Sequence, residues 1–248
     1  MTTQRQVMLR EWIPAMATAC LILASGCQST PKQPAPRIAN YWLGPVTIAV
    51  APAVNLSGSN DFDPARFADL MAGELSYADG VSIIPVSRVM GVLGAQGAEG
   101  VESPSHALEL TRLLGADAIL VFAVIEYDPY DPPSLGISAQ LYGTKGRTGG
   151  GIDPVALSRQ GGLDESDGAE RPRRLLSQTQ RIYDATHQDI VEEVKTFAAL
   201  RGADGSPYGW RRYVVSQQDY IRFCCHATIR ALFDSPLESG RVGRGRDG

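Results

Sequence analysis

Residues 46–86 constrain the fold of this chain more than any other stretch. One short apolar run begins at Val46 and a second extends from Val81 to Val86, with a polar loop and an amphipathic segment between them. The loop, Asn55–Asp61, is dense in residues that favour turns. Two apolar strands separated by a helix predict a parallel pair joined by a right-handed crossover. The stretch therefore indicates an α/β fold.

The amphipathic segment carries the signals of a helix. Asp63 is a favourable N-cap residue, and Pro64 is a favourable first helical residue. Apolar residues then recur every three or four positions, at Phe67, Leu70, Met71, Leu75 and Ala78. This spacing places them on one face of a helix, which predicts that the face packs against the sheet.

Two further helices are predicted before the middle of the chain. Ser87 is the expected cap of a short helix over Arg88–Leu93. Ser103–Pro104 opens a second helix, and Gly115 is expected to end it.

Three more strands complete the expected sheet. Residues 116–127 form the most apolar run after the amino-terminal segment, which predicts a central strand. Residues 137–142 alternate apolar and polar side chains, which predicts a half-buried strand antiparallel to it. Leu175–Tyr183 is a further strand candidate. The prediction is a mixed sheet of about five strands with helices packed on it, in one domain over residues 45–234.

The carboxyl-terminal half predicts two helices. Thr186 is the expected cap of the first, which ends at Gly202, and Ser216 is the expected cap of the second, Gln217–Phe233. On the second helix, one stripe is expected to face the core: Tyr220, Cys224, Ala227 and Ala231.

The first strand and its loop resemble two families of bacterial periplasmic proteins. Pro52 after the strand, followed by Asn55, Ser57 and Gly58, is similar to the amino-terminal domain of TolB-type proteins and to the CsgG-like curli-secretion lipoproteins. Gly115–Ala118 matches a run that those families carry before a strand. The resemblance covers about residues 45–143 and implies the fold. The motif is a loop signature rather than a catalytic one, and turn chemistry alone also accounts for it.

The amino-terminal segment reads as an export and anchoring signal. Arg5 and Arg10 precede an apolar run that is too short to span a bilayer as a mature helix. Ala24–Cys27 resembles the bacterial lipobox, in which small residues precede a cysteine that is lipidated. Residues 1–26 are then a lipoprotein signal peptide and Cys27 is the acylated first residue, attached to the bilayer. The alternative is an ordinary secretory signal with an incidental cysteine.

Three other segments are predicted to lack regular structure. Residues 27–44 are expected to form a flexible tether, and residues 144–174 a mobile insertion. Residues 235–248 are expected to be a disordered tail. Gln28, rather than Asp, follows the cysteine, which resembles lipoproteins sorted to the periplasmic side of the outer membrane.

Composition and motifs argue against several functions. The formal charge of −4 and the lack of a basic patch speak against nucleic-acid binding. Cys224–Cys225–His226 cannot converge on one ion, because successive helical residues diverge by about 100°, so buried packing is the expected role of these cysteines. His106 and His187 have no evident Ser or Cys partner. The sequence thus predicts no catalytic residue, metal site or cofactor.

The acidic residues leave one enzymatic alternative open. Glu126, Asp128 and Asp131 are able to bind a cation, although proline-rich turns collect aspartates for conformational reasons. An envelope hydrolase or metal-dependent enzyme would use Asp61, Asp63, Asp128 or Asp131.

The preferred function is a non-enzymatic envelope lipoprotein that binds another envelope protein and supports assembly or secretion. The predicted partner-binding residues are Asn55, Ser57, Asp61, Tyr208 and Trp210. Packing over a core edge is the alternative role of Tyr208 and Trp210. A self-assembling ring, a homo-oligomer related to curli channels, is a further alternative. A membrane pore is not expected, because no stretch shows the ten-residue alternation that membrane hairpins need.

Overall fold

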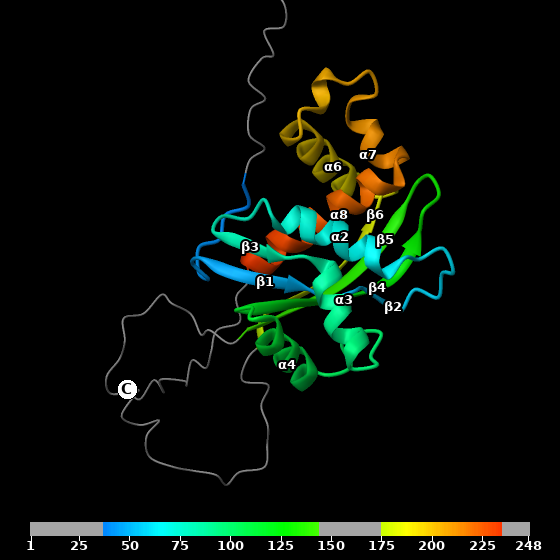
Figure 1. Ribbon diagram of the computed structural model, residues 1–248. Helices are drawn as coiled ribbons and strands as arrows, with labels where there is room; N and C mark the ends of the chain where they lie inside the picture. The colour runs from blue at the N-terminus through cyan, green and yellow to red at the C-terminus, as the bar shows by residue number, and fades with distance from the viewer. Residues whose placement is uncertain (1–36, 144–174, 235–248) are drawn as a thin grey trace, which may run out of the picture. The chain divides into compact units, whose positions relative to one another are not determined.

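The computed structural model describes residues 37–143 and 175–234, which form a mixed sheet with helices on both faces (Figure 1). The main path of the sheet has the strand order β3-β1-β4-β5-β6, and the short strand β2 pairs with β4. The predicted fold class is therefore confirmed. Cys27, the predicted signal peptide, the insertion 144–174 and the tail 235–248 lie outside the described residues.

The first half of the sheet is parallel. β1 (Val46–Val50) lies between β3 (Val81–Ile84) and β4 (Ala118–Asp128) and is parallel to both. β2 (Val54–Asn55) also runs parallel to β4. The predicted parallel pair and the central strand are both confirmed.

The second half of the sheet is antiparallel. β5 (Ser134–Gly143) pairs antiparallel with β4, and β6 (Leu175–Asp184) pairs antiparallel with β5. The alternation predicted within residues 137–142 is present from Ile137 to Leu141, but β5 as a whole is more buried than predicted. The reason is its position: β5 is hydrogen-bonded to a strand on each side, and α8 packs against it.

Helix capping explains where α2 (Pro64–Leu75) and α4 (Pro104–Leu114) begin. Asp63 Oδ1 accepts hydrogen bonds from the amides of Ala65 and Arg66, at 3.0 and 3.1 Å. Ser103 Oγ accepts one from the amide of His106, at 3.1 Å. These interactions satisfy amide donors that the helix itself leaves free. Gly115 ends α4 with a φ of 66°, a conformation that favours glycine.

Two predicted caps are wrong. α3 (Val86–Ala95) begins directly after Pro85, and Ser87 lies inside the helix. α6 (Gln188–Leu200) begins after His187, without a side-chain cap. The amide and hydroxyl of Thr186 instead donate to Asp184 Oδ1, at 2.8 and 2.7 Å, so this threonine closes a turn before the helix.

The predicted tether boundary at residue 44 is also wrong. Ile38 and Leu43 are buried, and Ile38 forms a bridge with Ala78. Trp42 Nε1 donates to the carbonyl of Phe233, at 2.8 Å. Apolar side chains within a polar stretch thus extend the packed domain to at least Ile38.

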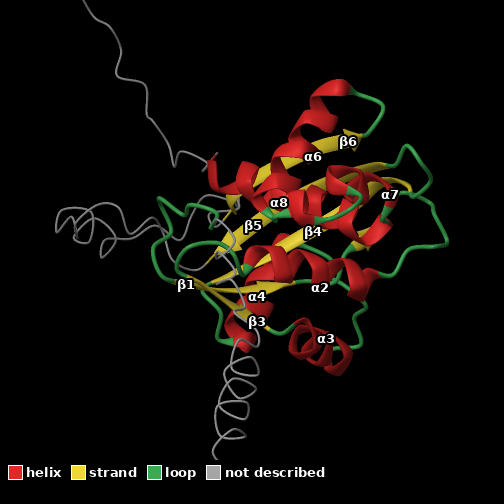
Figure 2. Ribbon diagram, turned by 90° about the horizontal axis from the view of Figure 1, so that it is seen from above, coloured by secondary structure: helices red, strands yellow, loops and turns green. Residues whose placement is uncertain are grey.

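Each face of the sheet has its own core. α2, α6 and α8 (Gln217–Asp234) cover one face, while α3 and α4 cover the other (Figure 2). Two 3₁₀ turns, η1 (Ala203–Gly205) and η2 (Gly209–Arg211), and the short helix α7 (Arg212–Val215) connect α6 to α8. None of the helices within the described ranges has the length and apolarity needed to cross a bilayer.

The buried surface of α8 is wider than predicted. Tyr220 and Cys224 are buried as expected, but Ala227 and Ala231 are only half-buried. Eleven of its residues are buried, Cys225 and Ile229 among them, because α8 lies on the sheet and also packs beside α2.

Candidate functional site

The predicted contact residues of the β2–α2 loop are engaged within the loop itself. Asn55 Oδ1 accepts from the amide and hydroxyl of Ser57, at 3.1 and 2.8 Å, and its Nδ2 donates to the carbonyl of Ser59, at 2.8 Å. The amide of Asp61 donates to Ser59 Oγ, at 3.3 Å. These are the self-contained bonds of an Asx turn, which hold the shape of the loop.

The other two predicted contact residues lie at η2, on a different part of the surface. Tyr208 is 74% exposed. Trp210 is half-buried, and the charged groups of Lys195 and Arg211 each lie 5.2 Å from its ring centroid. The Asn55–Asp61 loop and the α6–α7 connection lie apart in Figure 1. The five residues predicted as one surface are thus not brought together.

Three of the acidic residues proposed for metal or hydrolytic chemistry have local partners. Asp63 caps α2, Asp128 Oδ1 accepts from the amide of Tyr130, and Glu126 accepts from the hydroxyl of Ser134. Over residues 37–143 and 175–234, no group of three or more His, Cys, Asp or Glu side chains is placed to hold a metal ion.

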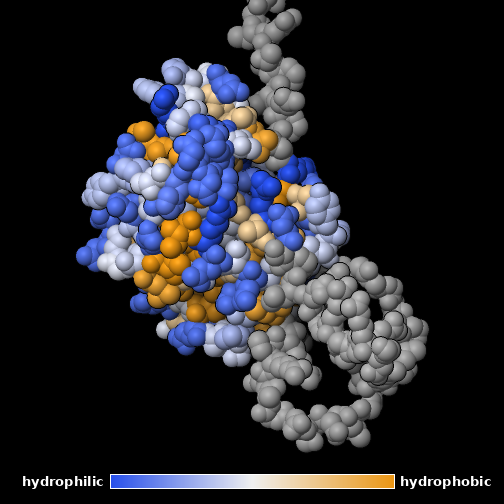
Figure 3. All heavy atoms as spheres, turned by 180° about the vertical axis from the view of Figure 1, so that it is seen from behind, coloured by the Kyte–Doolittle hydropathy of each residue, from blue (hydrophilic) through white to orange (hydrophobic). Residues whose placement is uncertain are grey.

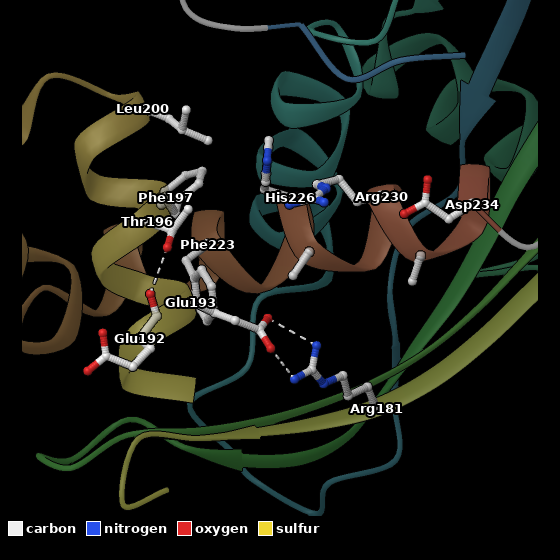
Figure 4. A pocket seen from close by; sticks show the side chains of 12 residues that line it. Arg181, Glu192, Glu193, Thr196, Phe197, Leu200, Phe223, His226, Arg230 and Asp234 are labelled. Carbon is white, nitrogen blue, oxygen red and sulfur yellow. Dashed lines mark hydrogen bonds and ion pairs between the residues drawn. The ribbon is translucent and has the colours of Figure 1, made fainter. Parts of the chain in front are cut away.

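A surface groove of about 450 Å³ lies between β6, α6 and α8 (Figure 4). Five of its lining residues are apolar: Phe197, Leu200, Phe223, Ala227 and Ala231. The other lining residues are charged or polar: Arg181, Glu192, Glu193, Thr196, His226, Arg230 and Asp234. We call this feature the β6 groove.

One ion pair joins β6 to α6 at the side of the groove. Arg181 projects from β6 toward α6, where its guanidinium donates to both carboxylate oxygens of Glu193, at 3.0 and 2.5 Å (Figure 4). This bond raises the pKa of Arg181 above its ordinary value. Two parallel bonds of this kind fix the orientation of both side chains. The pair therefore ties α6 to the last strand of the sheet.

A second, buried set of polar groups lies behind His226. Glu74 of α2 is 4% exposed and forms an ion pair with Arg201, whose guanidinium lies 4.0 Å from the ring centroid of Tyr77. His226 Nδ1 is buried, lies 3.6 Å from Glu74 Oε2 and has no hydrogen-bond partner among the described residues. His226 also lines a second hollow of about 260 Å³ beside the groove, together with Ile38.

The two cysteines of α8 do not supply a nucleophile to the groove. None of the described residues that line it is a serine or a cysteine. Cys224 and Cys225 lie on α8 but are fully buried, and burial raises the pKa of both thiols. A buried thiol is a poor nucleophile, because the thiolate is the reactive form.

The groove residues were not recognised as a site from the sequence. Arg181 lay in a predicted strand and Glu193 in a predicted helix, and their contact depends on how the helix crosses the strand. His226 was noted only beside the cysteines. The alternation in β6 does provide a signal. Arg181 is an even number of residues away from the buried Ser177 and Tyr183, so its side chain points to the same face of the strand as theirs.

No family model matches this chain, and no curated protein matches it. Solved structures do resemble it. The LpoB carboxyl-terminal domain from Salmonella enterica is 13% identical, with 44% of this chain and 81% of that chain covered and a TM-score of 0.36. Lipoprotein GNA1162 from Neisseria meningitidis is 17% identical, with 66% and 99% covered and a TM-score of 0.40. With TM-scores below 0.5, this likeness assigns neither an activity nor a partner to the chain. The TolB-like and CsgG-like label is not confirmed by these matches.

Proposed function

We propose that this protein is a lipid-anchored, non-enzymatic lipoprotein of the bacterial cell envelope that binds a partner protein at the β6 groove. The observation that carries the proposal is the groove itself, which is lined by both apolar and charged residues (Figure 4). Protein interfaces likewise combine apolar and polar contacts. The role is that of an accessory factor in assembly or secretion.

Exposed apolar side chains support this role. Leu200, at the end of α6, lines the groove and is 40% exposed. Apolar side chains also gather on one part of the face drawn in Figure 3, while hydrophilic side chains cover most of the remainder. Exposed apolar surface that is rimmed by polar residues is typical of sites that contact another protein.

The anchor supplies the location. Ala24–Cys27 has the pattern of a lipobox, and Cys27 would carry the acyl chains that hold the protein to the bilayer. Anchoring with more than one chain is stable, since each buried methylene contributes about 0.8 kcal/mol. Gln28 favours the periplasmic side of the outer membrane. The proposed partners are therefore the bilayer, through Cys27, and one envelope protein.

Acylation is tested with radiolabelled palmitate in cells. We expect the wild-type protein to be labelled and to fractionate with the outer membrane, and Cys27→Ala to lose the label because the acceptor thiol is gone. Cys20→Ala is the matched control and keeps the label. Labelling that persists in Cys27→Ala contradicts the anchor.

Partner binding is tested by photo-crosslinking in intact cells. The photoreactive residue p-benzoyl-L-phenylalanine replaces Leu200 in the groove or Leu113, which is 55% exposed on α4 over the other face of the sheet. We expect an envelope protein to be crosslinked from Leu200 and not from Leu113. A ladder of self-crosslinks alone would favour the ring alternative. Equal capture from both positions would contradict the groove as the site.

A further inference from the structure

The last strand of the sheet has an open edge. Among the described residues, β5 is the only strand that pairs with β6, so the other side of β6 has no strand partner. One backbone group of β6, the carbonyl of Tyr183, accepts a hydrogen bond from the hydroxyl of Tyr220 on α8, at 2.9 Å. The strand is 10 residues long, which corresponds to ~33 Å of edge. It contains neither proline nor lysine, two residues that natural proteins use to guard such edges.

The side chains of β6 leave the edge accessible on the face away from α6 and α8. Gln178, Gln180 and Ile182 are exposed, and Ile182 retains 49% of its surface. Their neighbours of the other parity, such as Ser177 and Tyr183, point to the helices and are buried. An exposed isoleucine on a long open edge would gain side-chain contacts if another strand paired with β6.

The β6 groove adjoins this edge. Arg181 of β6 lines the groove with residues of α6 and α8 (Figure 4). A strand added beside β6 would send alternate side chains toward the helix side of the sheet, since side chains alternate between the two faces. On that side, Phe197 and Leu200 offer apolar contacts.

These features identify the occupant as a polypeptide in extended conformation. A row of backbone donors and acceptors at strand spacing is matched by another strand and by no other secondary structure. The apolar residues that line the groove favour a segment with apolar side chains at every second position. In this recognition mode, main-chain hydrogen bonds give affinity, and the contacts of alternate side chains give specificity.

We propose that an extended segment of the partner protein adds to the sheet beside β6 and places alternate side chains in the β6 groove. The inference rests on the proposed function and names the way in which the partner is recognised. The occupant is a segment of another protein, not a second copy of this chain and not the chain's own residues 144–174.

The first stage of the test is photo-crosslinking of the full-length, acylated protein in intact cells. The photoreactive residue replaces Gln180 on β6 or, as a matched control, Ser82, an exposed residue on the opposite edge strand β3. We expect one envelope protein to be crosslinked from Gln180 and not from Ser82. Mass spectrometry then identifies the crosslinked peptide.

The second stage tests the strand geometry with that peptide, made synthetically. Two versions carry N-methyl groups on alternate residues, one set in each version. In an added strand only one set points its N–H groups at β6. We expect one version to bind the acylated protein in detergent at least tenfold more weakly than the parent peptide, and the other to change by less than twofold. A peptide bound as a helix is weakened by both, because both break helical hydrogen bonds.

The outcomes separate the inference from the proposed function. Crosslinks to an envelope protein from Leu200 but not from Gln180, or equal effects of the two N-methylated versions, overturn strand addition and leave the accessory role standing. A crosslinked peptide that belongs to this chain also overturns the inference, since a second copy or the 144–174 segment then occupies the edge. Absence of any envelope protein from both Leu200 and Gln180 contradicts both proposals.

Discussion

The two edges of the sheet are built differently. β3 has four residues and is followed at once by Pro85, which cannot donate to a further strand. The chain just before β3 is also covered, because Ile38 pairs with Ala78. β6 has 10 residues, contains no proline and, among the described residues, pairs with no strand on its outer side. The β3 edge is therefore closed, because its strand is short and neighbouring residues cover it. The β6 edge remains available for pairing with another strand.

The contrast continues in the layers around the strands. The parallel half has helices on both faces, α2 on one and α3 with α4 on the other (Figure 2). Parallel strands are typically covered in this way. β6 is covered mainly on the side of α6 and α8, and three of its side chains are exposed. The sheet thus changes from a closed core to a surface that is able to receive another chain, and the following predictions test this difference.

The largest expected effect on stability comes from removing a buried side chain on the helix-facing side of β6. Tyr183 is fully buried, contacts Phe223 and shares a hydrogen bond of 3.0 Å with Thr228 Oγ1. We expect Tyr183→Ala to lower the free energy of unfolding by about 3–5 kcal/mol, as for other buried aromatic side chains, measured by urea denaturation. Tyr183→Phe, which keeps the ring, is the control and should cost about 1 kcal/mol. Equal costs would mean that the hydroxyl, and not the packed ring, holds β6.

A pair of proline variants distinguishes the two sides of β6. In a strand, successive residues direct their N–H groups to opposite sides, so Thr179 and Gln180 point one N–H toward β5 and one toward the open edge. We expect the variant that removes the bond to β5 to lose about 1–3 kcal/mol of unfolding free energy. The two variants are Thr179→Pro and Gln180→Pro. The one that removes the N–H pointing to the open edge should lose clearly less unfolding free energy. If both cost the same, the outer side of β6 is hydrogen-bonded too, and the contrast between the edges disappears.

The elements of this contrast were largely readable from the sequence. The central strand, the parallel pair, the Asp63 and Ser103 caps and β6 itself follow from apolar runs and turn chemistry, which act over a few residues. Strand order at the edge and the covering of β3 by Ile38 depend on contacts between residues far apart in the chain. No local pattern encodes them, so the open edge of β6 was not predicted.

The candidate site was less predictable than the fold. Asn55 and Ser57 are predicted contact residues, but their side chains hold the turn together. Arg181 and Glu193 both line the groove, and they are brought together by a contact between a strand and the helix after it. Local sequence predicts that both elements exist, but the angle at which they cross is set by packing over the whole sheet.

A charge placed on either edge sharpens the comparison without unfolding the protein. Gln180→Lys on β6 and Ser82→Lys on β3 both alter exposed side chains, so each should change the free energy of unfolding by less than about 0.5 kcal/mol. Lysine on an edge opposes strand pairing. We therefore expect Gln180→Lys to reduce crosslinking from Leu200 several-fold and Ser82→Lys to leave it unchanged. A loss in both variants, or in neither, removes the functional distinction between the edges.

The smallest expected effect is a pH dependence at the end of β6. The amide and hydroxyl of Thr186 both donate to Asp184, and these bonds lower the pKa of the Asp184 carboxyl below its ordinary value. A carboxyl with a lowered pKa in the folded state stabilises the protein above its unfolded pKa of about 4, and this contribution is lost as the pH falls through the folded value. The Asp184 carboxylate lies near the surface, where solvent screens its interactions, so the contribution should be well below about 1 kcal/mol.

Thr186→Val isolates this contribution, because it removes the hydroxyl donor and keeps the amide donor and the side-chain shape. We expect the pKa of Asp184 in Thr186→Val, measured by NMR titration, to lie closer to the ordinary value than in the wild type. The acid limb of the stability curve should flatten slightly. An Asp184 pKa that does not move would show that the amide alone orders this turn, and that the turn after β6 is held by its backbone, as the closed edge at β3 is.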